Sequence, residues 1–186
     1  MKNRSVWFAY FLVIVAVVIR VLSHERILPL PANFAPVAAL ALFGGVFLGK
    51  KYAIIVPLAA EILSDFIIGF YDLGVMLSVW LSFAAVGLIG LLLRKHKNIT
   101  NIIYASLGAS VLFFVATNFA VWAQGAWYDK TWQGLVLCFT MALPFFRNTI
   151  LGDIFFIAVF FGIYEFVLYL NKVREGTSKK LAKSSE

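Results

Sequence analysis

The sequence predicts an all-α membrane protein, a polytopic helical bundle of about six transmembrane helices. Of its 186 residues, 62% are hydrophobic and the mean hydropathy is +0.92, whereas soluble domains are roughly 45–50% apolar. The apolar residues form long unbroken runs, which favour spanning helices over the alternating strands of a β-barrel. A soluble fold could not cover this much apolar surface, so we expect lipid to surround the chain.

Six apolar runs are long enough, or nearly so, to cross the hydrocarbon core, which takes about 20 helical residues. We place the spans at 6–23, 34–49, 52–71, 73–93, 101–123 and 146–170. The second span is short, and Asn33 is expected to cap it. Pro36 falls in the first turn, where the backbone N–H that proline lacks would have no partner within the helix. The segment 132–145 is apolar but short, so we expect an interfacial or re-entrant helix that Pro144 closes.

The basic residues between the runs predict the orientation, because cytoplasmic loops are enriched in Lys and Arg. Twelve of the 16 basic residues fall on one side: Lys2, Arg4, Lys50, Lys51, Arg94, Lys95, Lys97, Lys172, Arg174, Lys179, Lys180 and Lys183. Both termini are therefore expected in the cytoplasm, and the net charge of +7 reflects topology, not nucleic-acid binding. Residues 1–171 form one transmembrane domain in this interpretation, and 172–186 form a basic, disordered cytoplasmic tail.

Polar side chains inside the spans predict a ligand site, because charged groups in a bilayer are costly. Glu61 and Asp65 lie four residues apart and share one helix face. The candidate binding residues lie in or near the outer halves of four spans: Asn33, Asp65, Asn118, Trp122, Arg147, Asn148 and Asp153. This asymmetry favours a pocket that opens outward. In it, Arg147 would hold an anionic group, and Asn118 and Asn148 would orient the ligand.

Three function classes remain open at this point. The leading one is a substrate-binding or transport protein for a small organic micronutrient. The second is a proton- or ion-coupled carrier that uses Glu61 and Asp65, with Glu61 near the midplane as the coupling site. The third is a non-transport scaffold, in which Arg147 pairs with Asp65 or Asp153 for structural reasons. Arg20 is expected to snorkel or pair locally.

Enzymatic chemistry finds little support in the sequence. It contains no Walker A loop, no Gly-x-Ser-x-Gly and no His-Glu-x-x-His motif. His24 and His96 fall in loops on opposite sides of the membrane and cannot together ligate a haem. The single Cys138 is read as an inert apolar residue. We therefore expect no catalytic residues, no metal and no cofactor. The small residues Ala35-x-x-x-Ala39 and Gly45-x-x-x-Gly49 are interpreted as internal packing faces.

Three stretches carry a resemblance to a known family. They are Pro31-Ala-Asn-Phe-Ala-Pro-Val-Ala-Ala-Leu-Ala-Leu-Phe-Gly-Gly45, Leu63-Ser-Asp65 with Gly69-Phe-Tyr71, and Pro144-Phe-Phe-Arg-Asn-Thr-Ile-Leu-Gly-Asp153. Over roughly 5–170, the chain resembles a family of small bacterial integral membrane proteins. That family is similar in turn to the substrate-binding S-components of energy-coupling-factor (ECF) vitamin transporters.

The resemblance implies a six-helix protein of the bacterial cytoplasmic (inner) membrane that captures a vitamin-like molecule from outside. It also implies docking on a transmembrane partner that carries two ATPases, through an Ala-x-x-x-Ala face of the first helix. Here the first span has only Ala9 and Ala16, which favours a solitary S-component. Some solitary members resemble corrinoid transporters that hold cobalt through a cysteine, and Cys138 does not match that position.

Overall fold

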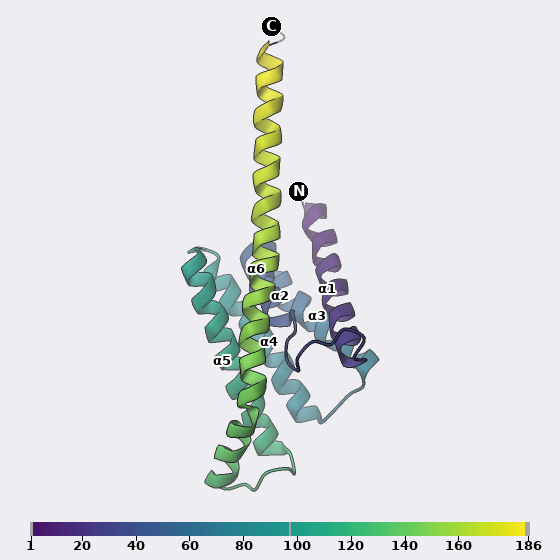
Figure 1. The fold of residues 1–186 in the computed structure, drawn as a ribbon, viewed down its shortest axis with the longest axis vertical. Helices are drawn as coiled ribbons and strands as arrows, with labels where there is room; N and C mark the ends of the chain where they lie inside the picture. Colours follow the sequence, from purple (N-terminus) through teal and green to yellow (C-terminus); the bar gives the residue numbers. More distant parts are fainter. Residues whose placement is uncertain (1, 97, 185–186) are drawn as a thin grey trace.

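The computed structural model describes residues 2–96 and 98–184, and within them every regular element is a helix (Figure 1). Lys97, one of the basic residues used for the topology, lies outside the described residues. In chain order the elements are α1 (Lys2–His24), α2 (Val37–Phe43), the π-helical turn η1 (Gly44–Leu48), α3 (Lys50–Ile68), α4 (Leu73–Leu93), α5 (Ile99–Gln124) and α6 (Trp132–Ser184). The predicted all-α helical bundle is confirmed.

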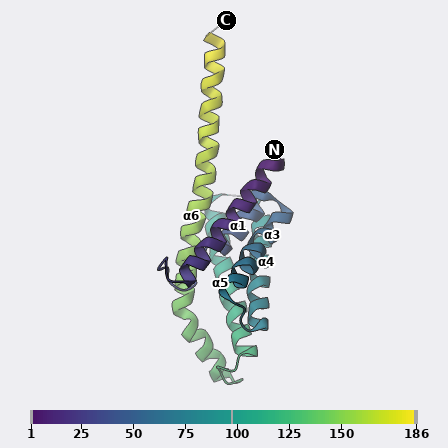
Figure 2. The same cartoon turned by 90° about the vertical axis from the view of Figure 1, so that its right-hand side faces the viewer.

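Four helices, α1, α4, α5 and α6, are long and apolar enough to cross a membrane, so the chain is a membrane protein. The α2–η1 segment has 7 + 5 = 12 residues and is only about 18 Å long. α3 is long enough, but it carries Lys50, Lys51, Glu61 and Asp65. Figures 1 and 2 show both termini at the same end of the bundle. We call this the terminal end and the opposite one the linker end.

The short helix α2 forms the centre of the molecule. All seven of its residues are at most 4% exposed, because α3, α4, α5 and α6 surround it. The turn that follows it packs backbone to backbone against α4. A Cβ placed on Gly45 would lie 2.6 Å from the Gly87 carbonyl oxygen and from the Gly90 carbonyl carbon. The small residues of this segment therefore permit close internal packing, as the sequence predicts.

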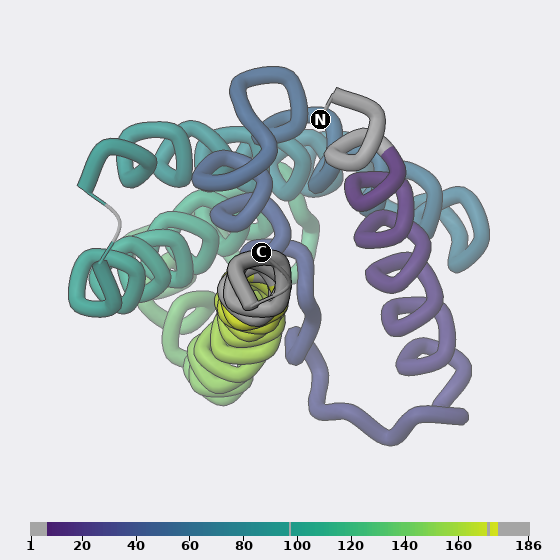
Figure 3. Tube along the Cα trace, turned by 90° about the horizontal axis from the view of Figure 1, so that it is seen from above, coloured from purple at the N-terminus to yellow at the C-terminus, as the bar shows by residue number. Residues whose placement is uncertain are grey.

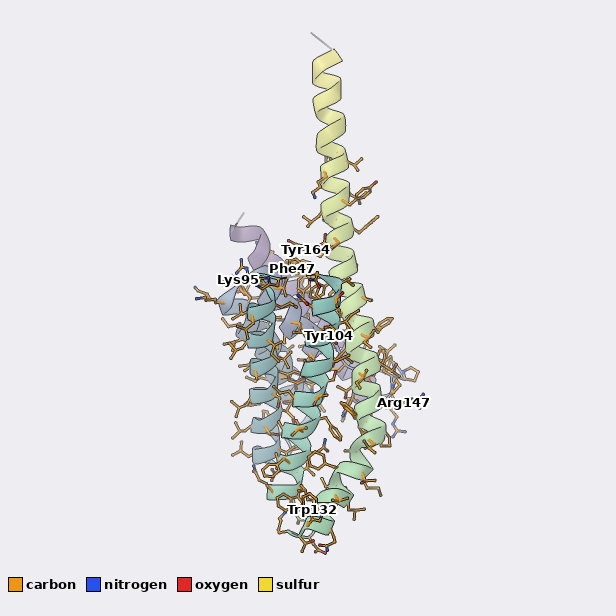
Figure 4. All side chains as sticks on the ribbon, turned by 90° about the vertical axis from the view of Figure 1, so that its left-hand side faces the viewer. Phe47, Lys95, Tyr104, Trp132, Arg147 and Tyr164 are labelled. Carbon is orange, nitrogen blue, oxygen red and sulfur yellow. The ribbon has the colours of Figure 1, made fainter. Side chains whose placement is uncertain are left out.

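An aromatic cluster closes the terminal end. It joins α2 and η1 to α6 and consists of Phe43, Phe47, Phe160, Phe161 and Tyr164. The Phe47 and Tyr164 ring centroids are 4.0 Å apart, and Phe43 is completely buried. Figure 4 shows the rings of Phe47 and Tyr164 near Lys95, at the end of the bundle opposite Trp132. The terminal end is thus filled by packed rings, and none of these five residues lines either of the two cavities described below.

α6 corrects two expectations. It continues through Pro144, although we expected a separate helix over 132–145. Proline removes one backbone hydrogen bond but only bends a helix that is supported on both sides, and the first turns of α6 are tilted from the rest (Figure 2). We expected the tail 172–186 to be disordered, but α6 continues through 172–184 and ends at Ser184, while 185–186 lie outside the described residues. The Lys, Ala and Leu residues of the tail are good helix formers, and they extend a helix that is already nucleated.

Candidate functional site

Two adjoining cavities lie inside the bundle, toward the linker end. Cavity 1 measures about 310 Å³, and residues of α1, the α1–α2 linker (25–36), α3, α4, α5 and α6 line it. Cavity 2 measures about 300 Å³ and lies between α4, α5 and α6. Both have Asn33, Val79, Phe113 and Thr149 in their walls, so the two cavities meet there. Each is at the lower limit of the size that small-molecule sites usually have.

The polar wall of cavity 1 is built around Arg20 of α1. Its Nη1 lies 2.6 Å from Glu61 Oε2, and its Nη2 lies 3.1 Å from Asp65 Oδ1. Nη1 also donates to the Ser64 hydroxyl. The Glu61 and Asp65 side chains are only 2% exposed and the Arg20 side chain 18%. Glu61, Ser64 and Asp65 share one face of α3 because they are separated by three and four residues. That face meets α1, so Arg20 joins the two helices.

This arrangement corrects the expectation that Arg20 snorkels or pairs locally. The guanidinium bridges residues 41 and 45 positions away in the sequence. Two buried carboxylates on α3 need a cation, and the planar fork of an arginine can engage both at once. Sequence reasoning missed Arg20 because a basic residue near a span end normally reaches the interface. The two residues do lie at a similar depth in the bundle. Arg20 is four residues from the end of α1, and Asp65 is three residues from the end of the neighbouring helix α3.

The second oxygen of Asp65 is also occupied. The indole N–H of Trp80 donates to Asp65 Oδ2 at 3.0 Å, so this carboxylate accepts from α1 on one side and from α4 on the other. Tyr71, in the α3–α4 loop, lines the same cavity. Partial burial, reinforced by the nearby carboxylates, raises the pKa of its hydroxyl above the usual value. Tyr71 is therefore a neutral group in the wall of cavity 1.

Asp153 of α6 is the third carboxylate in the wall of cavity 1. It is 2% exposed, and its Oδ2 accepts a hydrogen bond of 2.7 Å from the Ser110 hydroxyl of α5. Among the side chains that the structure describes, no cation lies within ion-pair distance of it. Asp153 thus differs from Glu61 and Asp65, which share one arginine.

The α1–α2 linker is fixed to α6 at the edge of the cavities. The Asn148 side chain donates to the Ala32 carbonyl at 3.0 Å. A Cβ on Gly152 would lie 3.1 Å from the Phe34 Cα, so the glycine lets the linker approach closely. Figure 3 shows the linker returning from the end of α1 to the centre of the bundle beside α6. Asn148 therefore positions the linker that carries Asn33.

Asn33 does not cap a helix, contrary to expectation. Its φ is 66°, a left-handed conformation that Asn tolerates better than most residues. α2 begins only at Val37, after Pro36, and no side chain caps it. The turn at Asn33 lets the linker change direction before α2 starts. Asn33 consequently lies in the wall that separates the two cavities.

Cavity 2 is largely apolar. Its walls contain the rings of Phe113, Phe114, Phe145 and Phe146 and the side chains of Val75, Val79 and Val121. The polar groups in it are Asn33, Thr117, Asn118 and Thr149. The Asn118 amide N–H donates to its own helix at the Phe114 carbonyl, 2.7 Å away. A ring-sized apolar group would find a matching environment here.

Three candidate residues do not line either cavity: Asn148, which holds the linker, and the two residues Trp122 and Arg147. Trp122 donates from its indole N–H to the Asp129 carbonyl at 2.9 Å, and the Lys130 ammonium lies 5.9 Å from its ring centroid. It stabilises the α5–α6 loop. Arg147 is exposed and lies on the side of α6 turned away from α4 and α5 (Figure 4). Among the described residues it has no ion pair with Asp65 or Asp153.

The comparisons with known proteins give a family and nothing beyond it. Residues 1–176 match a family of unknown function, DUF6580. The chain belongs to this family. No curated protein and no solved structure matches it.

The structure brings five of the eight polar residues predicted for ligand binding or proton coupling to the cavities: Asn33, Glu61, Asp65, Asn118 and Asp153. Asn148 lines neither cavity, but its hydrogen bond to Ala32 holds the linker that carries Asn33. No group of three or more His, Cys, Asp or Glu side chains in the described residues is placed to hold a metal ion. The arrangement places three buried carboxyl groups and one arginine next to a compartment lined by phenylalanine rings.

Proposed function

We propose that this chain is a membrane protein that binds a small organic molecule in the two adjoining cavities and carries it across the bilayer. The observation that supports this most directly is the buried charge around cavity 1. Intramembrane ionisable groups are costly and concentrate on substrate and ion pathways. Here three carboxylates and one arginine, from α1, α3 and α6, face one cavity.

The asymmetry of the bundle gives the proposal a direction. Both termini and the aromatic cluster are at one end, while the cavities lie toward the other. If the basic loops are cytoplasmic, the terminal end faces the cytoplasm and the ligand enters from outside. We place the protein in the bacterial cytoplasmic membrane on this basis. A solitary carrier and an S-component-like subunit that docks on an ATP-driven partner would both use the same site.

The test is native mass spectrometry of the protein purified from its own cells in mild detergent. We expect a small molecule to co-purify at one per chain. Ala35 lines cavity 1 and is half-buried, so Ala35→Trp should fill the cavity and abolish the bound mass. Ala158, which is exposed on α6, provides the matched control Ala158→Trp, which should retain the ligand. An empty wild-type protein that shows no thermal shift with a metabolite library would favour a scaffold instead.

The Arg20 cluster favours a second candidate, a proton- or ion-coupled carrier. One guanidinium holds two carboxylates at 2.6 and 3.1 Å, so the cluster has one negative charge in excess when both are ionised. A proton or a metal cation could neutralise it during transport. In liposomes that contain a pH-sensitive dye, this candidate predicts a proton flux that Glu61→Gln abolishes. An equal flux in the variant would contradict it.

A further inference from the structure

The charge balance of cavity 1 indicates which ligands it can accept. Its titratable wall groups are Arg20, His24, Glu61, Asp65, Tyr71 and Asp153. One of these groups is a guanidinium and three are carboxyl groups. Both terminal nitrogens of Arg20 are already engaged by α3, so the guanidinium has little capacity left for an anionic ligand. The wall therefore favours a cation.

Only one of the three carboxylates lacks a charge partner. Glu61 pairs with Arg20 through Oε2, and Asp65 is bound through both oxygens, to Arg20 and to Trp80. Asp153 is equally buried but receives only the neutral hydroxyl of Ser110. A buried carboxylate without a cation is strongly unfavourable. An ammonium group that enters cavity 1 would supply both the missing charge and hydrogen-bond donors.

The neighbouring cavity indicates the rest of the molecule. Cavity 2 meets cavity 1 at Phe113 and Thr149, and Thr149 precedes Asp153 by one helical turn on α6. Cavity 2 has a volume of about 300 Å³, and four phenylalanine rings make its walls largely apolar. A ligand with its charged group at Asp153 can therefore place a ring in cavity 2, against the paired rings of Phe114 and Phe146, whose centroids are 4.5 Å apart.

We propose that the site takes a protonated amine that carries an aromatic or similar ring, with the ammonium at Asp153 and the ring in cavity 2. This inference rests on the proposed function and names its substrate class. It also assigns separate roles to the carboxylates. Asp153 contacts the ligand, whereas Glu61 and Asp65 hold Arg20 and thereby the α1–α3 wall.

Three matched sets of probes test the charge requirement. They are the amines 2-phenylethylamine and tryptamine, the neutral alcohols 2-phenylethanol and tryptophol, and the anions 3-phenylpropanoate and indole-3-propanoate. Affinity is measured by isothermal titration of the purified full chain. We expect the amines to bind at least about tenfold more tightly than the alcohols, because a buried charge pair is lost in the alcohols. The anions should bind weakest.

Asp153→Asn keeps the shape of the side chain and removes its charge, so it should lower amine affinity by about tenfold or more and leave alcohol affinity unchanged. Asp129→Asn, in the exposed α5–α6 loop, is the matched control and should bind amines like the wild type. The probe comparison on the wild-type chain needs no variant, so a misfolded Asp153→Asn does not prevent the test. Equal or tighter binding of alcohols or anions would overturn the amine assignment.

The native mass spectrometry described above separates this failure from failure of the proposed function. A co-purified neutral or anionic molecule would overturn the amine class and leave a binding protein. An empty protein that binds none of the probes would overturn both.

Discussion

The two ends of the bundle are held together in different ways. At the terminal end, Gly45 packs against the backbone of α4 and the aromatic cluster fills the remaining space. At the linker end, α1 is joined to α3 through Arg20, and two cavities remain between the helices. The first end depends on shape and the second on charge. We infer that substitutions at the terminal end change stability alone, whereas those at the linker end change ligand binding as well.

The largest expected effect comes from removing the charge that holds the linker end. Arg20→Met leaves Glu61 and Asp65 buried without a cation, so the free energy of unfolding should fall by about 3–5 kcal/mol. Thermal unfolding in detergent measures the loss. The triple variant Arg20→Met/Glu61→Gln/Asp65→Asn should recover most of it. If the single and triple variants are equally unstable, the ion pairs are not what holds α1 to α3.

The next effect is steric and belongs to the terminal end. Gly45→Ala would place a Cβ 2.6 Å from α4 backbone atoms, which forces the helices apart and should cost about 1–3 kcal/mol. Gly108 on α5 has no atom within 4 Å of its Cβ position, so Gly108→Ala should be neutral or slightly stabilising. Both variants should bind ligand with wild-type affinity, as titration can show. A weaker affinity in folded Gly45→Ala would mean that the two ends are coupled.

A smaller effect is expected at the contact between the linker and α6. Asn148→Leu removes the hydrogen bond to Ala32 and should lower stability by about 1 kcal/mol. Backbone amides of residues 32–35 should then exchange hydrogen faster, as measured by mass spectrometry. Gln133→Leu, at an exposed position of α6, serves as the control. Unchanged exchange in Asn148→Leu would show that the linker is held by packing alone.

The smallest effect is expected at Arg147. Its side chain is exposed and outside both cavities, so Arg147→Ala should change stability by less than about 0.5 kcal/mol and leave ligand affinity unchanged. The same titration and thermal unfolding measure both quantities. Loss of binding in the folded variant would restore the anionic ligand that the sequence alone suggested.

The sequence predicts the helices well because their signal is local. Long apolar runs bounded by charges place α1, α3, α4 and α5 within a few residues of their observed ends. α6 is the exception, since Pro144 ends most helices in water but only bends one that neighbouring helices support. The shortness of α2 is visible in the sequence too, although its position at the buried centre is not.

The site is harder to predict because it depends on the rotation and pairing of helices. Asp65 and Arg147 are both charged and both fall in the outer halves of their expected spans, yet Asp65 faces the interior and Arg147 faces outward. Nothing local distinguishes the two. The pairing of Arg20 with α3 depends on which helix lies next to α1, and this is set by packing over the whole bundle.

The Arg20 contacts also have a consequence for biogenesis. Arg20 is synthesised 41 residues before Glu61, so α1 reaches the translocon while its guanidinium still has no partner. α3, with two carboxylates, is not among the helices that are apolar enough to partition into lipid by composition alone. Its insertion should therefore require α1 to remain nearby until the two helices can enter the lipid together as a neutralised pair.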